Sequence, residues 1–278
     1  MKKDKEITTP RIFQANAFVE GPHRGNPAGV CLLPEERDED FYRKVAIKMD
    51  LSETAFIVRE GNTFHLRWFT RGGSEVDLCG HATLATAFIL YKKGYVSSGE
   101  TIRFQTKSGI LSAKQEGDYI TLDFPLDELT ELKDRKNDFG ALLGLSPLYT
   151  AKTKFDYLVV VDSEEAIKNL EPDFDKLKKL QERGIIVTAK AVGKKYDFVS
   201  RFFAPAIGID EDPATGSAHC ALGPYWSSIL KKNRLIGYQA SREGGIVRVE
   251  VLEDRVSLSG KVKEVPVSGE LINTIKSY

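Results

Sequence analysis

Two short stretches of the sequence bring ionisable side chains to the start of a predicted helix. In the first, residues 78–81 read Leu-Cys-Gly-His, which puts His81 in the first helical turn. In the second, Asp212 precedes Pro213 and the run Ala-Thr-Gly-Ser at 214–217. A helix N-terminus carries unpaired backbone N–H groups and about half a positive charge, and glycine lets an anion approach them closely. The two starts therefore predict binding of a small carboxylate and stabilisation of negative charge that develops during a reaction.

Glu53 is a third ionisable candidate, because it opens the apolar run Thr-Ala-Phe-Ile-Val at 54–58. A carboxyl group at the start of a buried strand lies in a low dielectric, which favours its use as an acid or base near neutrality. The alternative is a carboxylate at a strand edge that faces water. At the second helix start, the alternative is that Thr215 or Ser217 only caps its helix.

The elements that must position these residues are two helices without a polar face, expected over 81–91 and 217–230. A helix that is apolar on every side is buried in protein. An amphipathic helix is expected over 38–49 and a weaker one over 168–182. Short strands are predicted at 11–15, 29–33, 64–70, 157–162, 184–189, 246–251, 255–258 and 262–267. Two buried helices in a strand-rich chain predict two sheets, each curved around its own helix.

The two helix starts also resemble each other. When Glu75 is aligned with Glu211, Gly80 falls opposite Gly216, because the two residues have the same separation in both stretches. The sequence around Arg67 also resembles the sequence around Arg201, with an offset of two residues in this alignment. The same order of strand, acidic turn, glycine and buried helix occurs twice, which indicates an internal duplication.

The best candidate boundary follows the strand-like residues 119–124, so we expect domains over 1–126 and 127–278, with the chain end able to cross back to the first. Pro224 lies inside the second buried helix, where a proline costs about 3 kcal/mol. We expect a kink or a tolerant contact there.

Composition narrows the class of protein. The chain has 278 residues, and its 40 basic and 40 acidic side chains cancel. This balance argues against a dedicated nucleic-acid binder. No apolar run is long enough for a membrane span, and we expect no secretory signal. Three cysteines are too few for a disulfide framework. We therefore expect a cytoplasmic globular protein with no nucleic-acid or membrane partner.

Four motifs in order make the sequence resemble the phenazine-biosynthesis PhzF-like family: Asn-Pro-Ala-Gly-Val at 26–30, Leu-Ser-Glu-Thr-Ala-Phe at 51–56, Leu-Cys-Gly-His-Ala-Thr at 78–83 and Glu-Asp-Pro-Ala-Thr-Gly-Ser-Ala at 211–218. The resemblance implies an α+β fold like that of diaminopimelate epimerase, with two similar domains and an active site between them. It also implies an isomerase that needs no cofactor, acts on a small anionic metabolite and forms a homodimer.

By this resemblance Glu53 is the general acid/base. The resemblance assigns catalysis to Glu53, His81 and Asp212, and substrate binding to Ser52, Gly80, Thr215, Gly216 and Ser217. One departure is the loop at 70–75, Thr-Arg-Gly-Gly-Ser-Glu, which lacks the family's Thr-Pro and gains a cation.

Three other functions stay open. Cys79 could serve a two-thiol racemase, since a thiol at a helix start has a lowered pKa, but no cysteine precedes the second helix. A metal site built from Asp77, Cys79, His81 and the His219-Cys220 pair lacks the usual ligand spacing, so no metal is expected. The chain could also bind a small carboxylate without turning it over. Nucleotide-binding glycine motifs are missing from the sequence.

Overall fold

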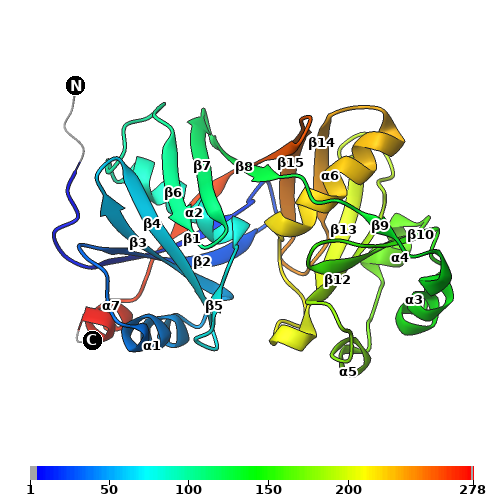
Figure 1. Cartoon of the computed structure of the whole chain (residues 1–278), viewed down its shortest axis with the longest axis horizontal. Helices are drawn as coiled ribbons and strands as arrows, with labels where there is room; N and C mark the ends of the chain where they lie inside the picture. Colours follow the sequence, from blue (N-terminus) through cyan, green and yellow to red (C-terminus); the bar gives the residue numbers. More distant parts are fainter. Residues whose placement is uncertain (1–4, 277) are drawn as a thin grey trace. The chain divides into compact units, whose positions relative to one another are not determined.

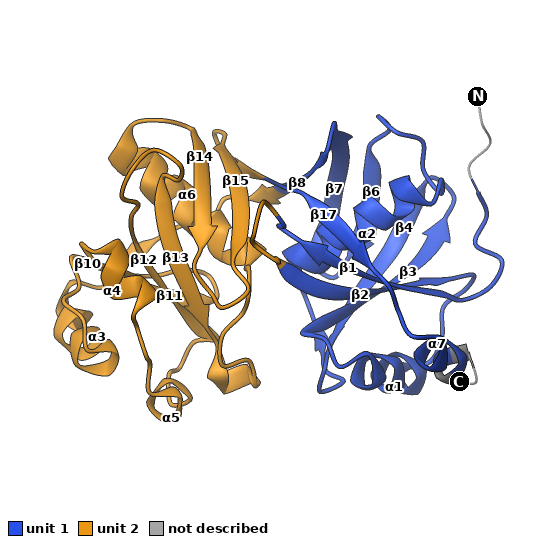
Figure 2. Ribbon diagram, turned by 180° about the vertical axis from the view of Figure 1, so that it is seen from behind, with its two compact units in different colours: residues 1–19, 26–123, 259–278 blue, residues 20–25, 124–258 orange. Residues whose placement is uncertain are grey.

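The computed structural model describes residues 5–276 and residue 278. The chain separates into two compact units (Figure 2). Unit 1 contains the chain up to Val19, then Asn26–Asp123 and the residues from Ser259 onward, and unit 2 contains Glu20–Gly25 and Phe124–Leu258. The chain thus passes into unit 2 next to the expected boundary, and its C-terminal part belongs to unit 1. Each unit has a curved sheet and one buried helix, which confirms the predicted α+β fold class.

The sheet of unit 1 has the strand order β17–β1–β2–β3–β4–β6–β7–β8 (Figures 1 and 2). Their bounds are Arg11–Ala17 (β1), Asn26–Leu33 (β2), Glu53–Glu60 (β3), Thr63–Thr70 (β4), Ile102–Thr106 (β6), Gly109–Glu116 (β7), Tyr119–Pro125 (β8) and Val262–Val265 (β17), and the short β5 (Glu75–Val76) pairs with β4. The β2–β3 and β4–β6 pairs are parallel, and the other pairs are antiparallel.

The buried helix of unit 1 is α2 (Gly80–Lys92), which contacts strands β1, β2, β3, β7 and β17. Apart from His81 and Lys92, its side chains are small or apolar, and its two threonines are buried as well. Their hydroxyls donate back to helix carbonyls, Thr83 to Cys79 at 2.6 Å and Thr86 to Ala82 at 2.7 Å, so neither is left without a hydrogen bond inside the protein. This confirms the helix predicted over 81–91.

Helix α1 (Glu39–Met49) covers the outside of the unit 1 sheet, beside α7 (Gly269–Lys276) (Figures 1 and 2). Asp38 caps α1 by accepting a 2.8 Å hydrogen bond from the Phe41 N–H. The buried face of α1 includes Phe41, Val45 and Met49, which follow each other at the four-residue spacing of an amphipathic helix and confirm the helix expected over 38–49.

Unit 2 has strands in the order β9–β10–β11–β12–β13–β14–β15, followed along the chain by β16. Their bounds are Thr130–Glu131 (β9), Tyr149–Lys152 (β10), Asp156–Val160 (β11), Gly184–Lys190 (β12), Phe198–Phe203 (β13), Arg234–Gln239 (β14), Gly245–Val251 (β15) and Arg255–Gly260 (β16). Helix α3 (Lys136–Leu143) lies on this unit too, and the buried helix is α6 (Gly216–Leu230).

The two units repeat one topology. In unit 2 the parallel pairs are β11–β12 and β13–β14, and the intervening pairs are antiparallel, which is the succession found from β1 to β7 in unit 1. Helix α2 follows β4 and β5, as α6 follows β13. The internal duplication inferred from the sequence is therefore present in the structure.

An arginine–glutamate pair recurs at the same place in both units. The Arg67 guanidinium donates to both carboxylate oxygens of Glu75 at 2.8 Å, and Arg201 does the same to Glu211 at 2.7 and 2.8 Å. Each pair spans the loop between a strand and its buried helix. Bidentate pairs of this kind fix geometry as well as charge, so each fixes the loop that leads to its helix start.

The weaker helix predicted over 168–182 is wrong. The structure has two short helices in this region, α4 (Glu164–Lys168) and α5 (Phe174–Leu177). Pro172 lies between them, where it lacks an N–H donor and disfavours a helical conformation at Glu171. The apolar spacing on either side of this proline was mistaken for one helix.

Pro224 does not end α6, which continues from Gly216 to Leu230. A proline leaves the carbonyl four residues earlier without its helical donor, and here that carbonyl belongs to Cys220. The Cys220 carbonyl accepts a 3.3 Å hydrogen bond from the Asp127 N–H instead. A donor from outside the helix thus compensates for the proline. None of the helices formed by residues 5–276 has the length and apolar character needed to cross a membrane.

Gly223 lets α6 approach β15 closely, because a Cβ added there would lie 2.7 Å from Cγ1 of Val249. We predict that Gly223→Ala lowers the free energy of unfolding by about 1–3 kcal/mol through overpacking, even though alanine favours a helix. Denaturant unfolding measures this. Ser228→Ala on the exposed side of the same helix is the control and should not destabilise, whereas Val249→Ala added to Gly223→Ala should recover part of the loss. Unchanged stability in Gly223→Ala would contradict the close packing.

Candidate active site

Glu53, His81 and Cys79 meet in unit 1. Glu53 is the first residue of β3, His81 is the second residue of α2, and Cys79 is the N-cap residue of that helix. One carboxylate oxygen of Glu53 lies 3.4 Å from Nε2 of His81, and Sγ of Cys79 lies 3.6 Å from Nδ1 of the same ring. All three residues are buried, with exposed fractions of 8%, 4% and 6%. The imidazole therefore lies between a carboxylate and a thiol.

Burial determines the charge of the imidazole. Desolvation lowers the pKa of His81 to about 3, so the ring is neutral at physiological pH. A neutral imidazole can donate a hydrogen bond to developing negative charge from one nitrogen and accept from the other. The positive end of the helix dipole also disfavours a cation at this position.

Gly29 explains part of the first motif. It lies on β2, paired in parallel register with Thr54, the residue after Glu53. A Cβ at Gly29 would lie 2.6 Å from the Thr54 hydroxyl oxygen. The glycine therefore allows β2 and β3 to pack closely where β3 begins. Ser52 ends the preceding turn, where its carbonyl accepts from the Arg71 N–H at 3.2 Å.

The cation gained in the 70–75 loop is engaged outside the Glu53 cluster. Arg71 pairs with Asp50 at 2.6 Å, and both side chains are more than half exposed. The loop departs from the family pattern without adding a charge to the buried cluster.

In unit 2, Asp212 and Thr215 are connected by Gln239. The Thr215 hydroxyl donates to the Asp212 carboxylate, and the Gln239 amide oxygen accepts from the Thr215 N–H at 2.8 Å. The Gln239 amide nitrogen donates to the Asp212 carbonyl at 2.7 Å and to the Thr215 hydroxyl at 3.1 Å. Gln239 is fully buried on β14, so the network fixes the loop before α6.

The N-cap side chains of α2 and α6 do not cap their helices. Thr215 and Cys79 are the N-cap residues of α6 and α2, and neither side chain accepts a hydrogen bond from its helix. Ser217, the other capping candidate, instead accepts a 2.9 Å hydrogen bond from Arg183. The prediction that Thr215 or Ser217 only caps α6 is therefore wrong, and Gly80 and Gly216 begin their helices as the anion-binding hypothesis requires.

Arg183 is a site residue that the sequence analysis missed. It donates to the Asp156 carboxylate through Nε at 2.9 Å and through a second nitrogen at 2.5 Å, and that second nitrogen also donates to Ser217. The rings of Phe155 and Phe202 each lie 5.3 Å from the guanidinium. These contacts place a fixed cation at the start of α6.

The duplication contained a signal for Arg183. Glu53 lies opposite Thr70 in the antiparallel pair of β3 and β4. In the corresponding pair of β12 and β13, Ile185 lies opposite Phe203, so the residue before Ile185, Gly184, lies opposite Ala204. Extending the repeat to these strands matches Glu53 with Gly184. The matching residue for Ser52 is then Arg183, so the position of a predicted substrate-binding serine carries an arginine in the second copy.

The predicted residues thus divide between the units. Unit 1 holds Ser52, Glu53, Gly80 and His81, and unit 2 holds Asp212, Thr215, Gly216 and Ser217. The expectation that one active site uses both sets stays a prediction.

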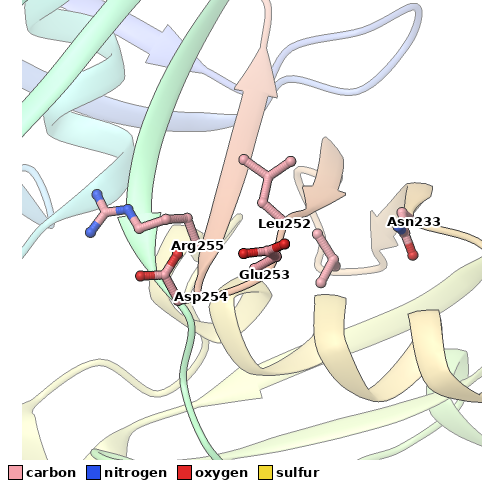
Figure 3. Close-up of a pocket in the computed structure, with 6 residues that line it drawn as sticks. Asn233, Leu252, Glu253, Asp254 and Arg255 are labelled. Atoms are coloured by element: carbon pink, nitrogen blue, oxygen red, sulfur yellow. The ribbon is translucent and has the colours of Figure 1, made fainter.

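A surface hollow in unit 2 contains none of these residues. It is lined by residues of the β15–β16 turn and the loop after α6, with Asn233, Leu252, Glu253, Asp254 and Arg255 among them (Figure 3). Its lining takes one polar side chain from the loop after α6 and the others from the hairpin turn, and it includes none of the predicted site residues, so the hollow is not the candidate site.

Comparison with known proteins matches residues 15–273 to the family described as phenazine biosynthesis-like protein. The chain belongs to the PhzF-like family. A protein named an uncharacterized isomerase from Halalkalibacterium halodurans is 48% identical over 259 residues, which are 93% of this chain and 97% of that protein. A second uncharacterized isomerase, from Pseudomonas aeruginosa, is 45% identical and covers 90% of this chain and 94% of its own length.

Solved structures agree with this family assignment. The crystal structure of a PhzF family protein from Enterococcus faecalis has a TM-score of 0.83 and 41% identity, and covers 93% of this chain and 99% of its own. A probable proline racemase from Agrobacterium radiobacter, 8% identical with a TM-score of 0.59, shares the fold alone. This PhzF-like protein is an isomerase, and its fold is that of the diaminopimelate epimerase-like enzymes.

The buried histidines make a pH dependence of stability predictable. His219 on α6 is fully buried, its Nδ1 donates to the Thr215 carbonyl at 2.8 Å, and desolvation lowers its pKa to about 4. Below pH 6.5 His81 and His219 bind protons in the unfolded chain but not in the folded chain. The free energy of unfolding therefore falls as the pH falls toward 4. Each histidine contributes about 1.4 kcal/mol per pH unit in that window.

We predict that His219→Asn, which keeps a hydrogen-bond donor, makes the free energy of unfolding less dependent on pH between pH 4 and 6.5, by the contribution of one proton. Urea unfolding at several pH values measures it. Cys220→Ala, a buried change without a group that titrates in this range, should lower stability at every pH and leave the slope unchanged. An unaltered slope in His219→Asn would show that this imidazole does not carry the effect.

Proposed function

We propose that the protein is a cofactor-independent isomerase that moves a proton between carbon atoms of a small anionic metabolite, with Glu53 as the general acid/base. The observation that carries the proposal is the Glu53 carboxylate, buried at the start of β3 and 3.4 Å from a neutral His81. A carboxylate held in a buried position beside a neutral ring can take up a proton from a carbon acid and return it.

In this mechanism Glu53 removes a proton alpha or vinylogous to a substrate carboxylate and returns it at another carbon. Negative charge grows on the substrate carboxylate as the proton leaves. Backbone N–H groups at the starts of α2 and α6, at Gly80 and Gly216, stabilise that charge, and one donor in such a site is worth about 3 kcal/mol. The neutral His81 ring adds a further donor, as in other sites that hold an uncharged imidazole.

The remaining predicted residues bind and orient the substrate. We assign Asp212 to catalysis, and Ser52, Thr215 and Ser217 to substrate binding. Arg183 supports this assignment, because it holds the Ser217 hydroxyl and adds a cation where a carboxylate would approach α6. A homodimer and a cytoplasmic location stay predictions.

A second candidate function uses the Cys79 thiol as acid or base, as in a two-thiol racemase. Its contact with His81 at 3.6 Å favours this candidate. The N-cap position of α6 holds Thr215 in place of a second thiol. Cys220 is fully desolvated, which raises its pKa to about 12 and makes it a poor proton donor or acceptor. The one-base mechanism of Glu53 needs no second thiol and is therefore preferred.

We predict that the protein incorporates solvent deuterium into a substrate found among small cyclic and amino-acid carboxylates, and that Glu53→Gln reduces the rate by about 10²–10⁴-fold. Mass spectrometry of the panel measures incorporation. Glu60→Gln, at the exposed end of the same strand, should exchange at the wild-type rate.

Equal exchange in wild type and Glu53→Gln would remove Glu53 from the mechanism. Loss of exchange in Cys79→Ser but not in Glu53→Gln would establish the thiol mechanism. Saturable binding of a carboxylate without any exchange would indicate a binding protein on the same fold.

A further inference from the structure

We propose that Glu53, Cys79 and His81 also form a binding site for a thiophilic divalent cation of the Zn²⁺ type, and that the bound cation inhibits the isomerase. One ring nitrogen, the thiol sulfur and a carboxylate oxygen of these residues all lie within 4.8 Å of one another. Among residues 5–276 and 278, no other group of three or more histidine, cysteine or acidic side chains comes together in this way. Imidazole, thiolate and carboxylate are the three side-chain ligands that zinc uses in proteins.

The distances fit a tetrahedral ion. Zinc lies about 2.3 Å from sulfur and about 2.0–2.1 Å from nitrogen, which puts two such ligands about 3.5–3.6 Å apart on a tetrahedron. Nδ1 of His81 and Sγ of Cys79 are 3.6 Å apart, so an ion fits on that edge without movement of either residue. The Glu53 carboxylate must then come closer, which rotation about its side-chain bonds can provide.

The environment of the His81 imidazole suits coordination of a cation. His81 is 4% exposed, and its Nε2 makes no hydrogen bond within the described part of the chain. Because no hydrogen bond at Nε2 fixes the tautomer of the ring, Nδ1 can be the unprotonated nitrogen, which is the form that coordinates a cation.

The other two thiols of the chain are unlike Cys79. Burial raises the pKa of both Cys31 and Cys220 to about 12, and neither belongs to a cluster of ligand side chains within residues 5–276 and 278. They therefore provide matched controls, since a cation that bound any buried thiol would not distinguish them from Cys79.

Binding requires only proton release. The Cys79 thiol loses its proton to solvent as the metal–sulfur bond forms, while Glu53 and His81 contribute lone pairs. Three protein ligands leave a fourth position for water. Binding itself does not depend on the proposed function. Inhibition does rest on it, because a coordinated Glu53 carboxylate cannot accept a proton from a carbon acid.

The binding experiment is a titration of the full chain with Co²⁺, which reports thiolate coordination through its charge-transfer absorption. Wild type and Cys220→Ser should develop the band, and one equivalent of Zn²⁺ should abolish it. Cys79→Ser should lose the band, and His81→Asn should bind Co²⁺ at least tenfold more weakly. Absence of the band in wild type, or its persistence in Cys79→Ser, would overturn the proposed site.

The inhibition experiment measures deuterium exchange with added Zn²⁺, each variant compared with its own rate in chelator. Zn²⁺ should inhibit wild type, and at least tenfold more Zn²⁺ should be needed for Cys79→Ser. A Co²⁺ band in a protein with no exchange under any condition would keep the metal site and reject the isomerase mechanism. Exchange that is insensitive to Zn²⁺, in a protein without the Co²⁺ band, would reject the metal site and keep the isomerase mechanism.

Discussion

A helix without a polar face must be enclosed on all sides, and this requirement organises both units. α2 has the sequence Gly-His-Ala-Thr-Leu-Ala at its start, and it is buried from its first residue. The sheet that encloses the helix brings the beginning of β3 next to the beginning of α2, which places Glu53 within 3.4 Å of His81. Their contact is thus a consequence of burying the helix. The same enclosure desolvates His81 and keeps its ring neutral.

The two copies keep one framework and differ in its chemistry. Both retain the arginine–glutamate pair before the buried helix, Arg67 with Glu75 and Arg201 with Glu211. At the equivalent positions around the helix start the side chains diverge. Unit 1 carries Ser52, Glu53, Cys79 and His81, and unit 2 carries Arg183, Gly184, Thr215 and Ser217. One copy therefore presents a carboxylate beside an imidazole, and the other presents a guanidinium beside a hydroxyl. In the proposed mechanism, duplication followed by this divergence supplies the proton carrier Glu53 and the cation Arg183 from the same fold.

Local patterns were sufficient for the framework and insufficient for the polar networks. The spacing of Phe41, Val45 and Met49 predicted α1, and uniform apolarity predicted α2. The single helix predicted over 168–182 is absent because Pro172 interrupts the segment, although apolar residues recur at helical spacing around it. Gln239 could not be found by pattern, because its partner Thr215 lies 24 residues away along the chain. Arg183 could be found only by extending the internal repeat to its strand, and its contact with Ser217, 34 residues away, could not. Such contacts depend on which strands become neighbours.

The neutral imidazole is what makes the Glu53 cluster suitable for two kinds of chemistry. If His81 carried a proton on both nitrogens, it would form an ion pair with Glu53 that stabilised the carboxylate and weakened it as a base. It would also have no lone pair to offer a metal ion. Because desolvation keeps the ring neutral, no imidazolium lies beside Glu53. The proposed proton transfer at Glu53 and the proposed cation binding at His81 and Cys79 therefore both depend on the burial of this one ring.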